Sequence, residues 1–186
     1  MRSNSNRLVR LTMTAVLTAL TCVMTLVVRI PSPTKGYLNL GDCFVLLDGW
    51  LLGPLYGAFA GGVGSALADL FAGYPVYLPA TLLIKGIMAW TIAVLPKLFS
   101  GKNKKYLRAG WIASCVVAEI LMVTGYYLYE ALIIGLGLIP ALAGVLENAV
   151  QGLAGAVSAY FLAEIISHTD ICSRNGVDGF ACKQGK

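Results

Sequence analysis

Several polar side chains lie inside long apolar runs of this sequence. Lys85 and Glu119 each lie near the middle of a run, and Asn148 and Gln151 lie in the last one. Ionisable groups within a bilayer are costly, so they tend to face a bundle interior or a water-filled cavity and to mark a functional site. Because Lys85 and Glu119 come at similar depths, they can form an ion pair with each other or contact a polar ligand.

Helical spacing gathers the polar groups on two faces. Glu119, Tyr126 and Glu130 are separated by seven and then four residues, which places them on one face of a helix. Asn148 and Gln151 likewise share a face of the last helix. Carboxylates, tyrosines, amides and one amine suit a small polar ring compound, which would be held by aromatic walls and a few oriented hydrogen bonds.

Two simpler interpretations stay open for these residues. Lys85 and Glu119 can form only a buried ion pair that locks two helices together. Asn148 and Gln151 can act only as hydrogen-bonding contacts between helices. Either interpretation can hold for part of the set while the rest binds a ligand.

Patterns typical of catalysis are missing from the sequence. It has no Ser-His-Asp set, no glycine-rich phosphate loop and no clustered Asp motif. His168 is the single histidine, and with Cys172 and Cys182 it forms too scattered a group to predict a metal site. We therefore expect no metal, no cofactor and no nucleotide-binding domain, so another subunit must supply energy if the chain transports against a gradient.

The elements that must position these groups are membrane helices. Of the 186 residues, 58% are hydrophobic and 12% charged, against about 25% charged in ordinary soluble domains. This excludes most soluble enzymes and nucleic-acid-binding proteins. The sequence predicts an all-α integral membrane protein, a compact bundle of six transmembrane helices in one domain over residues 1–170, followed by a flexible cytoplasmic tail over 171–186. The predicted helices cover residues 8–28, 43–52, 55–71, 76–99, 106–134 and 138–166.

The second predicted helix is short for a span, and Asp42 is expected to cap its start. Small residues follow at the start of the third predicted helix and within it, where Gly53, Gly57, Gly61 and Ser65 recur every four residues. Such ladders let helix backbones approach closely in lipid. We therefore expect the third helix to pack tightly inside the bundle.

Basic residues predict the orientation. Of the 14 Lys and Arg residues, three lie in residues 2–10, five in 97–108 and three in 174–186, whereas Arg29 and Lys35 lie in the loop between the first two helices. Lys and Arg are retained in cytoplasmic loops. Both termini are therefore predicted to be cytoplasmic, and the polar groups converge on the outer half of the bundle.

Four motifs give the chain a resemblance to a known family. They are Ala15-x-x-x-Ala19, the segment Tyr37-Leu38-Asn39-Leu40-Gly41-Asp42, the turn Gly53-Pro54-x-x-Gly57, and Glu147-Asn148-x-x-Gln151-Gly152. With six hydrophobic helices over about residues 8–166, the chain resembles the substrate-binding S component of energy-coupling factor (ECF) vitamin transporters, in the riboflavin, hydroxymethylpyrimidine and pyridoxine-like group.

The resemblance implies a membrane-embedded binding subunit, located in the cell membrane, for a small ring vitamin or vitamin precursor. It implies that Ala15 and Ala19 dock on a transmembrane coupling protein that works with two ATPase subunits, and that the substrate lies near the outer face under the loop between the first two helices. Nucleic acid is not an expected partner. The expected substrate-binding residues are Asn39, Lys85, Glu119, Tyr126, Glu130, Asn148 and Gln151.

Two other classes of protein are alternatives. One is a small integral membrane enzyme that uses Lys85 and Glu119 as acid and base. The other is an accessory membrane protein without a ligand. Binding of a vitamin-like compound by the purified protein separates the S component from the accessory protein, and turnover without ATPase subunits would favour the enzyme.

The charge distribution gives a test of orientation. Because the basic loop around Lys102 is predicted to be cytoplasmic, a cysteine replacing Asn103 in a variant without the native cysteines should resist a membrane-impermeant thiol reagent in intact cells. It should react after the cells are permeabilised. Ready labelling in intact cells would reverse the orientation and place the polar site on the cytoplasmic side.

Overall fold

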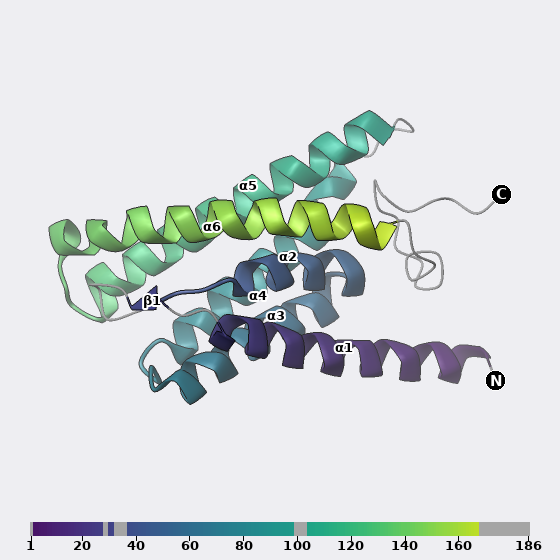
Figure 1. Cartoon of the computed structure of the whole chain (residues 1–186), viewed down its shortest axis with the longest axis horizontal. Coiled ribbons are helices and arrows are strands. Elements are labelled where there is room, and N and C mark those ends of the chain that lie inside the picture. Colours follow the sequence, from purple (N-terminus) through teal and green to yellow (C-terminus); the bar gives the residue numbers. More distant parts are fainter. Residues whose placement is uncertain (1, 28–29, 32–36, 99–103, 168–186) are drawn as a thin grey trace.

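The structure is a computed structural model that describes residues 2–27, 30–31, 37–98 and 104–167. Within these ranges the chain forms six α-helices packed side by side into one bundle (Figure 1). The helices are α1 (Arg2–Val27), α2 (Gly41–Leu52), α3 (Pro54–Ala72), α4 (Leu78–Leu98), α5 (Lys104–Leu128) and α6 (Leu138–Ser167). The predicted tail over 171–186 and most of the basic loop between α4 and α5 lie outside the described residues.

Helix α2 is much shorter than the other five helices. Five helices are long and apolar enough to cross a membrane, whereas α2 has 12 residues, or about 18 Å at the usual rise. Nearly all residues of α2 are buried. The sequence prediction of a six-helix membrane bundle with a short second helix is confirmed.

The helices at the two sides of the bundle show how the chain is arranged. In Figure 1, α1 lies along one side of the bundle, α5 and α6 lie on the opposite side, and α2, α3 and α4 lie between them. The beginning of α1 and the end of α6 are at the same end of the bundle. This arrangement agrees with the prediction that both termini face one side of the membrane.

Two short strands connect α1 to α2, and a glycine turn connects α2 to α3. Strands β1 (Ile30–Pro31) and β2 (Tyr37–Leu38) pair antiparallel between α1 and α2. Gly53 has φ +80° and Pro54 follows it as the first residue of α3, because glycine tolerates a positive φ and proline is favoured at a first helical position. The turn therefore reverses the chain between α2 and α3 with a single residue.

The small residues of α3 pack against three other helices, as the sequence predicted. A Cβ atom added at Gly57 would lie 2.6 Å from the backbone oxygen of Asp48 in α2, and one at Gly64 would lie 2.6 Å from that of Thr18 in α1. One at Gly62 would lie 2.7 Å from the backbone oxygen of Leu82 in α4. Helix α3 therefore holds α1, α2 and α4 at backbone contact distance.

Helix α1 contacts the bundle through hydroxyl groups. The Thr21 hydroxyl donates a hydrogen bond of 2.8 Å to Asp48 Oδ2 in α2, and both residues are fully buried. The opposite face of α1 exposes apolar side chains such as Val16 and Val23. Helix α1 is thus attached on one side and open on the other.

One sequence prediction about a helix end was wrong. Asp42 does not cap α2, because the helix already begins at Gly41 and the Asp42 side chain turns into the bundle. The fifth helix ends close to the predicted residue 134, but its last residues form the π-helical turn η1 (Tyr129–Ile133). A π turn inserts an extra residue, and such turns often mark functional sites.

The close approach of α3 to α4 gives a packing prediction. Gly62→Ala should lower the free energy of unfolding by about 1–3 kcal/mol, because its Cβ would force the helices apart. Thermal unfolding in detergent measures the change. Gly86→Ala is the matched control at the same interface, since its nearest contact is the Ala58 oxygen at 3.4 Å. Equal effects of the two substitutions would contradict the packing analysis.

Candidate functional site

A buried ion pair forms the centre of the candidate site. The Lys85 ammonium of α4 contacts Asp42 Oδ1 at the start of α2. Lys85 is 2% exposed and Asp42 is fully buried. Neither charge can exchange its partner for water at that depth, so the pair fixes α2 and α4 relative to each other.

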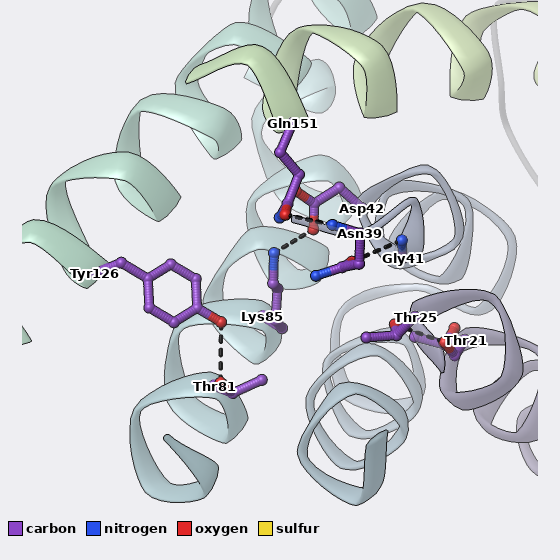
Figure 2. Close-up of polar contacts among 9 residues, drawn as sticks. All are labelled: Thr21, Thr25, Asn39, Gly41, Asp42, Thr81, Lys85, Tyr126 and Gln151. Carbon is purple, nitrogen blue, oxygen red and sulfur yellow. Dashed lines mark hydrogen bonds and ion pairs between the residues drawn. The ribbon is translucent and has the colours of Figure 1, made fainter. Parts of the chain in front are cut away.

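Gln151 and Asn39 extend this ion pair into a network (Figure 2). Gln151 Nε2 donates to Asp42 Oδ2 at 2.8 Å, and Gln151 Oε1 accepts the backbone N–H of Asn39 at 2.8 Å. Asn39 Oδ1 in turn accepts the backbone N–H of Gly41 at 2.8 Å. The Gln151 amide thus bonds through its nitrogen to α2 and through its oxygen to the segment that precedes α2.

Two glycines beside the network allow the helices that form it to approach each other closely. A Cβ at Gly155 in α6 would lie 2.6 Å from Asp42 Cβ, and one at Gly41 would lie 2.1 Å from Thr25 Oγ1 in α1. Without side chains at these two residues, α6 approaches α2, and α2 approaches the end of α1. The polar network therefore depends on small residues beside it.

An aromatic group adjoins the ion pair. The Lys85 ammonium lies 5.5 Å from the centroid of the Tyr126 ring, within the range of a cation–π contact. The Tyr126 and Thr81 hydroxyls are 2.9 Å apart, and Figure 2 shows this bond beside Lys85. Tyr77, whose ring centroid is 6.4 Å from that of Tyr126, donates from its hydroxyl to Glu130 Oε1 at 3.2 Å.

Glu119 of α5 is the third ionisable group at this level of the bundle. Its carboxyl group lies against Gly152, the neighbour of Gln151 in α6, where an added Cβ would be 2.7 Å from Oε2. The residue is 8% exposed, and neither carboxylate oxygen has a hydrogen-bond partner among the described residues. Glu119 is therefore near the ion pair without belonging to it.

The structure brings most of the expected site residues together. Asn39, Lys85, Gln151 and Tyr126 are joined through direct contacts, and Glu119 lies beside them. Glu130 is reached through Tyr77. Asn148 is half-buried on α6 and has no hydrogen-bonding partner for its side chain within the described ranges.

The interpretation of Lys85 and Glu119 as an ion pair, which the sequence left open, is wrong. Lys85 pairs with Asp42 and not with Glu119, because α2 enters the bundle between α4 and α6 and brings Asp42 closer. Sequence reasoning also missed Tyr77 and Thr81. Tyr77, Thr81 and Lys85 recur every four residues, which was a detectable signal, since this spacing places Thr81 and Lys85 on one face of α4 and Tyr77 in line with them in the turn before it.

Ala15 and Ala19, the residues expected to dock a partner, do not belong to this network. Both are exposed on α1, on the face that is open to the surroundings of the bundle. Within the described ranges, no group of three or more His, Cys, Asp or Glu side chains is placed to hold a metal ion.

Comparisons with known proteins identify the family of the chain. The family model described as "ECF-type riboflavin transporter, S component" matches residues 5–168. The chain is 30% identical over 164 residues to the "thiamine precursor transporter HmpT" of Lactococcus lactis subsp. cremoris (strain MG1363), covering 87% of this chain and 90% of that one. It is 42% identical over 136 residues to the "uncharacterized protein in gap 3'region" of Pyrococcus woesei, covering 73% of this chain and 86% of the relative.

The family and the transporter relative decide between the classes considered above. The chain is a multi-pass cell-membrane protein of vitamin or precursor transport, and it is not an enzyme that uses Lys85 and Glu119 as acid and base. The resemblance detected in the sequence motifs is confirmed, since the family model spans all six helices. The chain belongs to the family of S components of ECF-type riboflavin transporters.

Proposed function

We propose that this chain is the high-affinity substrate-binding subunit of an ECF-type ABC importer for a small ring vitamin or vitamin precursor. A separate transmembrane coupling protein and two ATPase subunits supply the energy. The observation that carries the proposal is the buried network of Asn39, Asp42, Lys85 and Gln151, which joins segments far apart in the sequence.

The chemistry of the surrounding groups supports a ring compound as substrate. Tyr77 and Tyr126 supply aromatic faces, and Glu119, Glu130 and Asn148 supply polar atoms beside them. A few fixed polar groups among aromatic walls are typical of small-molecule sites. The names of the matching family and of HmpT, riboflavin and thiamine precursor, both belong to vitamin chemistry.

The substrate-binding residues in this proposal are those expected from the sequence, with one addition. Asn39, Lys85, Glu119, Tyr126, Glu130, Asn148 and Gln151 form the set, and Asp42 joins it as the partner of Lys85. Asn39 gives the connection between α1 and α2 a direct bond to α6 through Gln151. Occupation of the site is thus linked to the position of that connection.

Helix α1 is the proposed docking surface for the coupling protein. Ala15 and Ala19 are exposed and are one helical turn apart, and Val16 and Val23 near them are also exposed. Small residues allow the backbone of a partner helix to approach closely in lipid. Because the network lies on the other side of α2, docking and substrate binding use different surfaces.

The direct test of the proposed function is ligand identification. Native mass spectrometry of the detergent-purified protein should detect a co-purified ring vitamin or precursor. Calorimetric titration with that compound should then give tight binding with no turnover. A purified, folded protein that binds no member of a vitamin panel would contradict the proposal and favour an accessory role.

The two amides on α6 should respond differently to substitution. Asn148→Ala should weaken substrate binding at least about tenfold with little change in stability, because its amide makes no hydrogen bond inside the described protein. Gln151→Ala should weaken binding and also lower stability by about 1–3 kcal/mol, because it leaves Asp42 and the Asn39 N–H unsatisfied. Titration and thermal unfolding measure the two quantities.

The control for these substitutions is Val150→Ala on the exposed face of α6, where the side chain is 57% exposed. This substitution should leave both the substrate affinity and the stability of the protein unchanged. Unchanged affinity in a folded Asn148→Ala protein would remove Asn148 from the site. A stability loss for Asn148→Ala as large as that for Gln151→Ala would assign Asn148 a structural role.

The docking surface gives a separate prediction. Ala15→Trp or Ala19→Trp should abolish uptake while substrate affinity of the isolated subunit stays nearly unchanged, because the added bulk blocks helix approach and not the site. Val157→Trp on the exposed face of α6 is the control and should transport normally. Equal loss of binding and transport would mean that the alanine face does not serve docking.

A further inference from the structure

Helix α2 takes part both in the polar network and in the contact with α1. Asp42 at its start binds Lys85 of α4 and Gln151 of α6. Asp48, six residues later, accepts the hydrogen bond of Thr21 from α1. The two aspartates are about 9 Å apart along the helix axis at the usual rise. Because a short helix is rigid, a shift at the start of α2 also moves Asp48.

Thr21 differs from its neighbours Thr18 and Thr25 in the acceptor of its hydroxyl group. Thr18 and Thr25 each donate to the backbone oxygen four residues earlier in α1, a local bond that any threonine in a helix can make. Thr21 instead donates to Asp48 Oδ2 at 2.8 Å, and both residues are fully buried. The hydroxyl of Thr21 therefore joins two helices.

Asp48 has no second donor within the described ranges. Its Oδ1 makes no hydrogen bond there, and Thr21 is the partner of its Oδ2. A buried carboxyl group without a donor is strongly unfavourable, so this bond holds α1 to α2. Helix α3, in contrast, meets α1 through Gly64, where an added Cβ would lie 2.6 Å from the Thr18 oxygen. That close packing includes no side-chain hydrogen bond from Gly64, so it constrains the position of α1 less specifically.

The contact between Thr21 and Asp48 joins the helix at the site to the helix with the docking surface. We propose that Asp48 is a positioning residue that couples substrate binding to docking, because it makes α1 follow α2 when the site is filled. Ala15 and Ala19 lie on the exposed face of α1, and Thr21, two residues after Ala19, lies on the buried face. This inference rests on the proposed function and adds a connection between its two surfaces.

A ligand in the site acts first on the start of α2. Asn39 bonds to Gln151 through its backbone and to Gly41, the first residue of α2, through its side chain. A ligand that contacts Asn39 or Gln151 therefore changes the position that α2 prefers. Such coupling is reciprocal, so docking that shifts α1 changes the substrate affinity by the same factor.

Docking measured with and without a bound compound tests the coupling. The full-length subunit is titrated with the coupling protein and the two ATPase subunits of the same organism in lipid nanodiscs. The probe is whichever of riboflavin, a hydroxymethylpyrimidine and pyridoxine binds the isolated subunit most tightly. In the wild-type subunit the probe should change the dissociation constant of docking at least about fivefold.

Substitutions at the two residues assign the effect. Thr21→Val keeps the shape and removes the hydroxyl, so the change in docking should fall below about twofold while the isolated subunit binds the probe nearly as before. Thr21→Ser keeps the hydroxyl and should keep the wild-type change. Asp48→Leu removes the other partner and should act like Thr21→Val. It leaves no unpaired carboxyl group, so it replaces Thr21→Val if that variant does not fold.

The matched control is Thr14→Val, which removes a buried hydroxyl that bonds within α1. This variant should keep the wild-type change, and an equal loss in it would overturn the inference. An unchanged response to the probe in Thr21→Val and Asp48→Leu would overturn it as well. A parallel loss of probe affinity in these two variants would place Asp48 in the site itself, which also overturns the positioning role.

The wild-type subunit separates this inference from the proposed function. If it binds a probe and docks, but docks equally well with and without the probe, the inference is overturned and the proposed function stands. A folded wild-type subunit that binds none of the three probes, or that does not dock, would contradict both.

Discussion

The buried ion pair of Lys85 with Asp42 is the contact on which the arrangement of the bundle depends. Helix α2 is too short to cross a bilayer, so its start lies within the bundle beside the middle of α6. Backbone groups at such depth must find partners inside the protein, since lipid offers none. The network meets this demand, because Gln151 and Asn39 take up the N–H groups of Asn39 and Gly41, and the Asp42 charge is matched by Lys85.

Helix α2 carries a second buried carboxylate that faces the other way. Asp42 turns toward α4 and α6, whereas Asp48 lies two turns later and accepts a hydrogen bond from Thr21 of α1. Both carboxylates are fully buried. The short helix thus holds the polar network on one side and the helix with the exposed alanines on the other, and a displacement of α2 would disturb both contacts.

The features that could be predicted from the sequence are those that depend on local periodicity, namely the helices and their buried faces. The apolar runs set the helices, and the spacing of Glu119, Tyr126 and Glu130 correctly placed all three on a buried face. Which side chains pair across helices depends on how closely the helices approach each other in the fold. The periodicity of the sequence carries no information about this. Asp42 followed turn residues and was therefore interpreted as a cap, although the missing side chain of Gly155 allows α6 and α2 to meet beside it.

The buried polar groups are of two kinds: those whose hydrogen bonds are made within the protein, and those whose hydrogen bonds are not. Asp42 and Gln151 use their hydrogen-bonding capacity on the fold, so their contribution to any ligand site comes through the shape they maintain. The Glu119 carboxyl group is buried and makes no hydrogen bond within the described residues. An unsatisfied buried group is costly in the empty protein, and that cost is recovered when a matching ligand arrives, which raises discrimination against ligands that lack the matching group. In this bundle the satisfied groups therefore set the architecture, and the unsatisfied Glu119 is the buried group left for a substrate in the function proposed above.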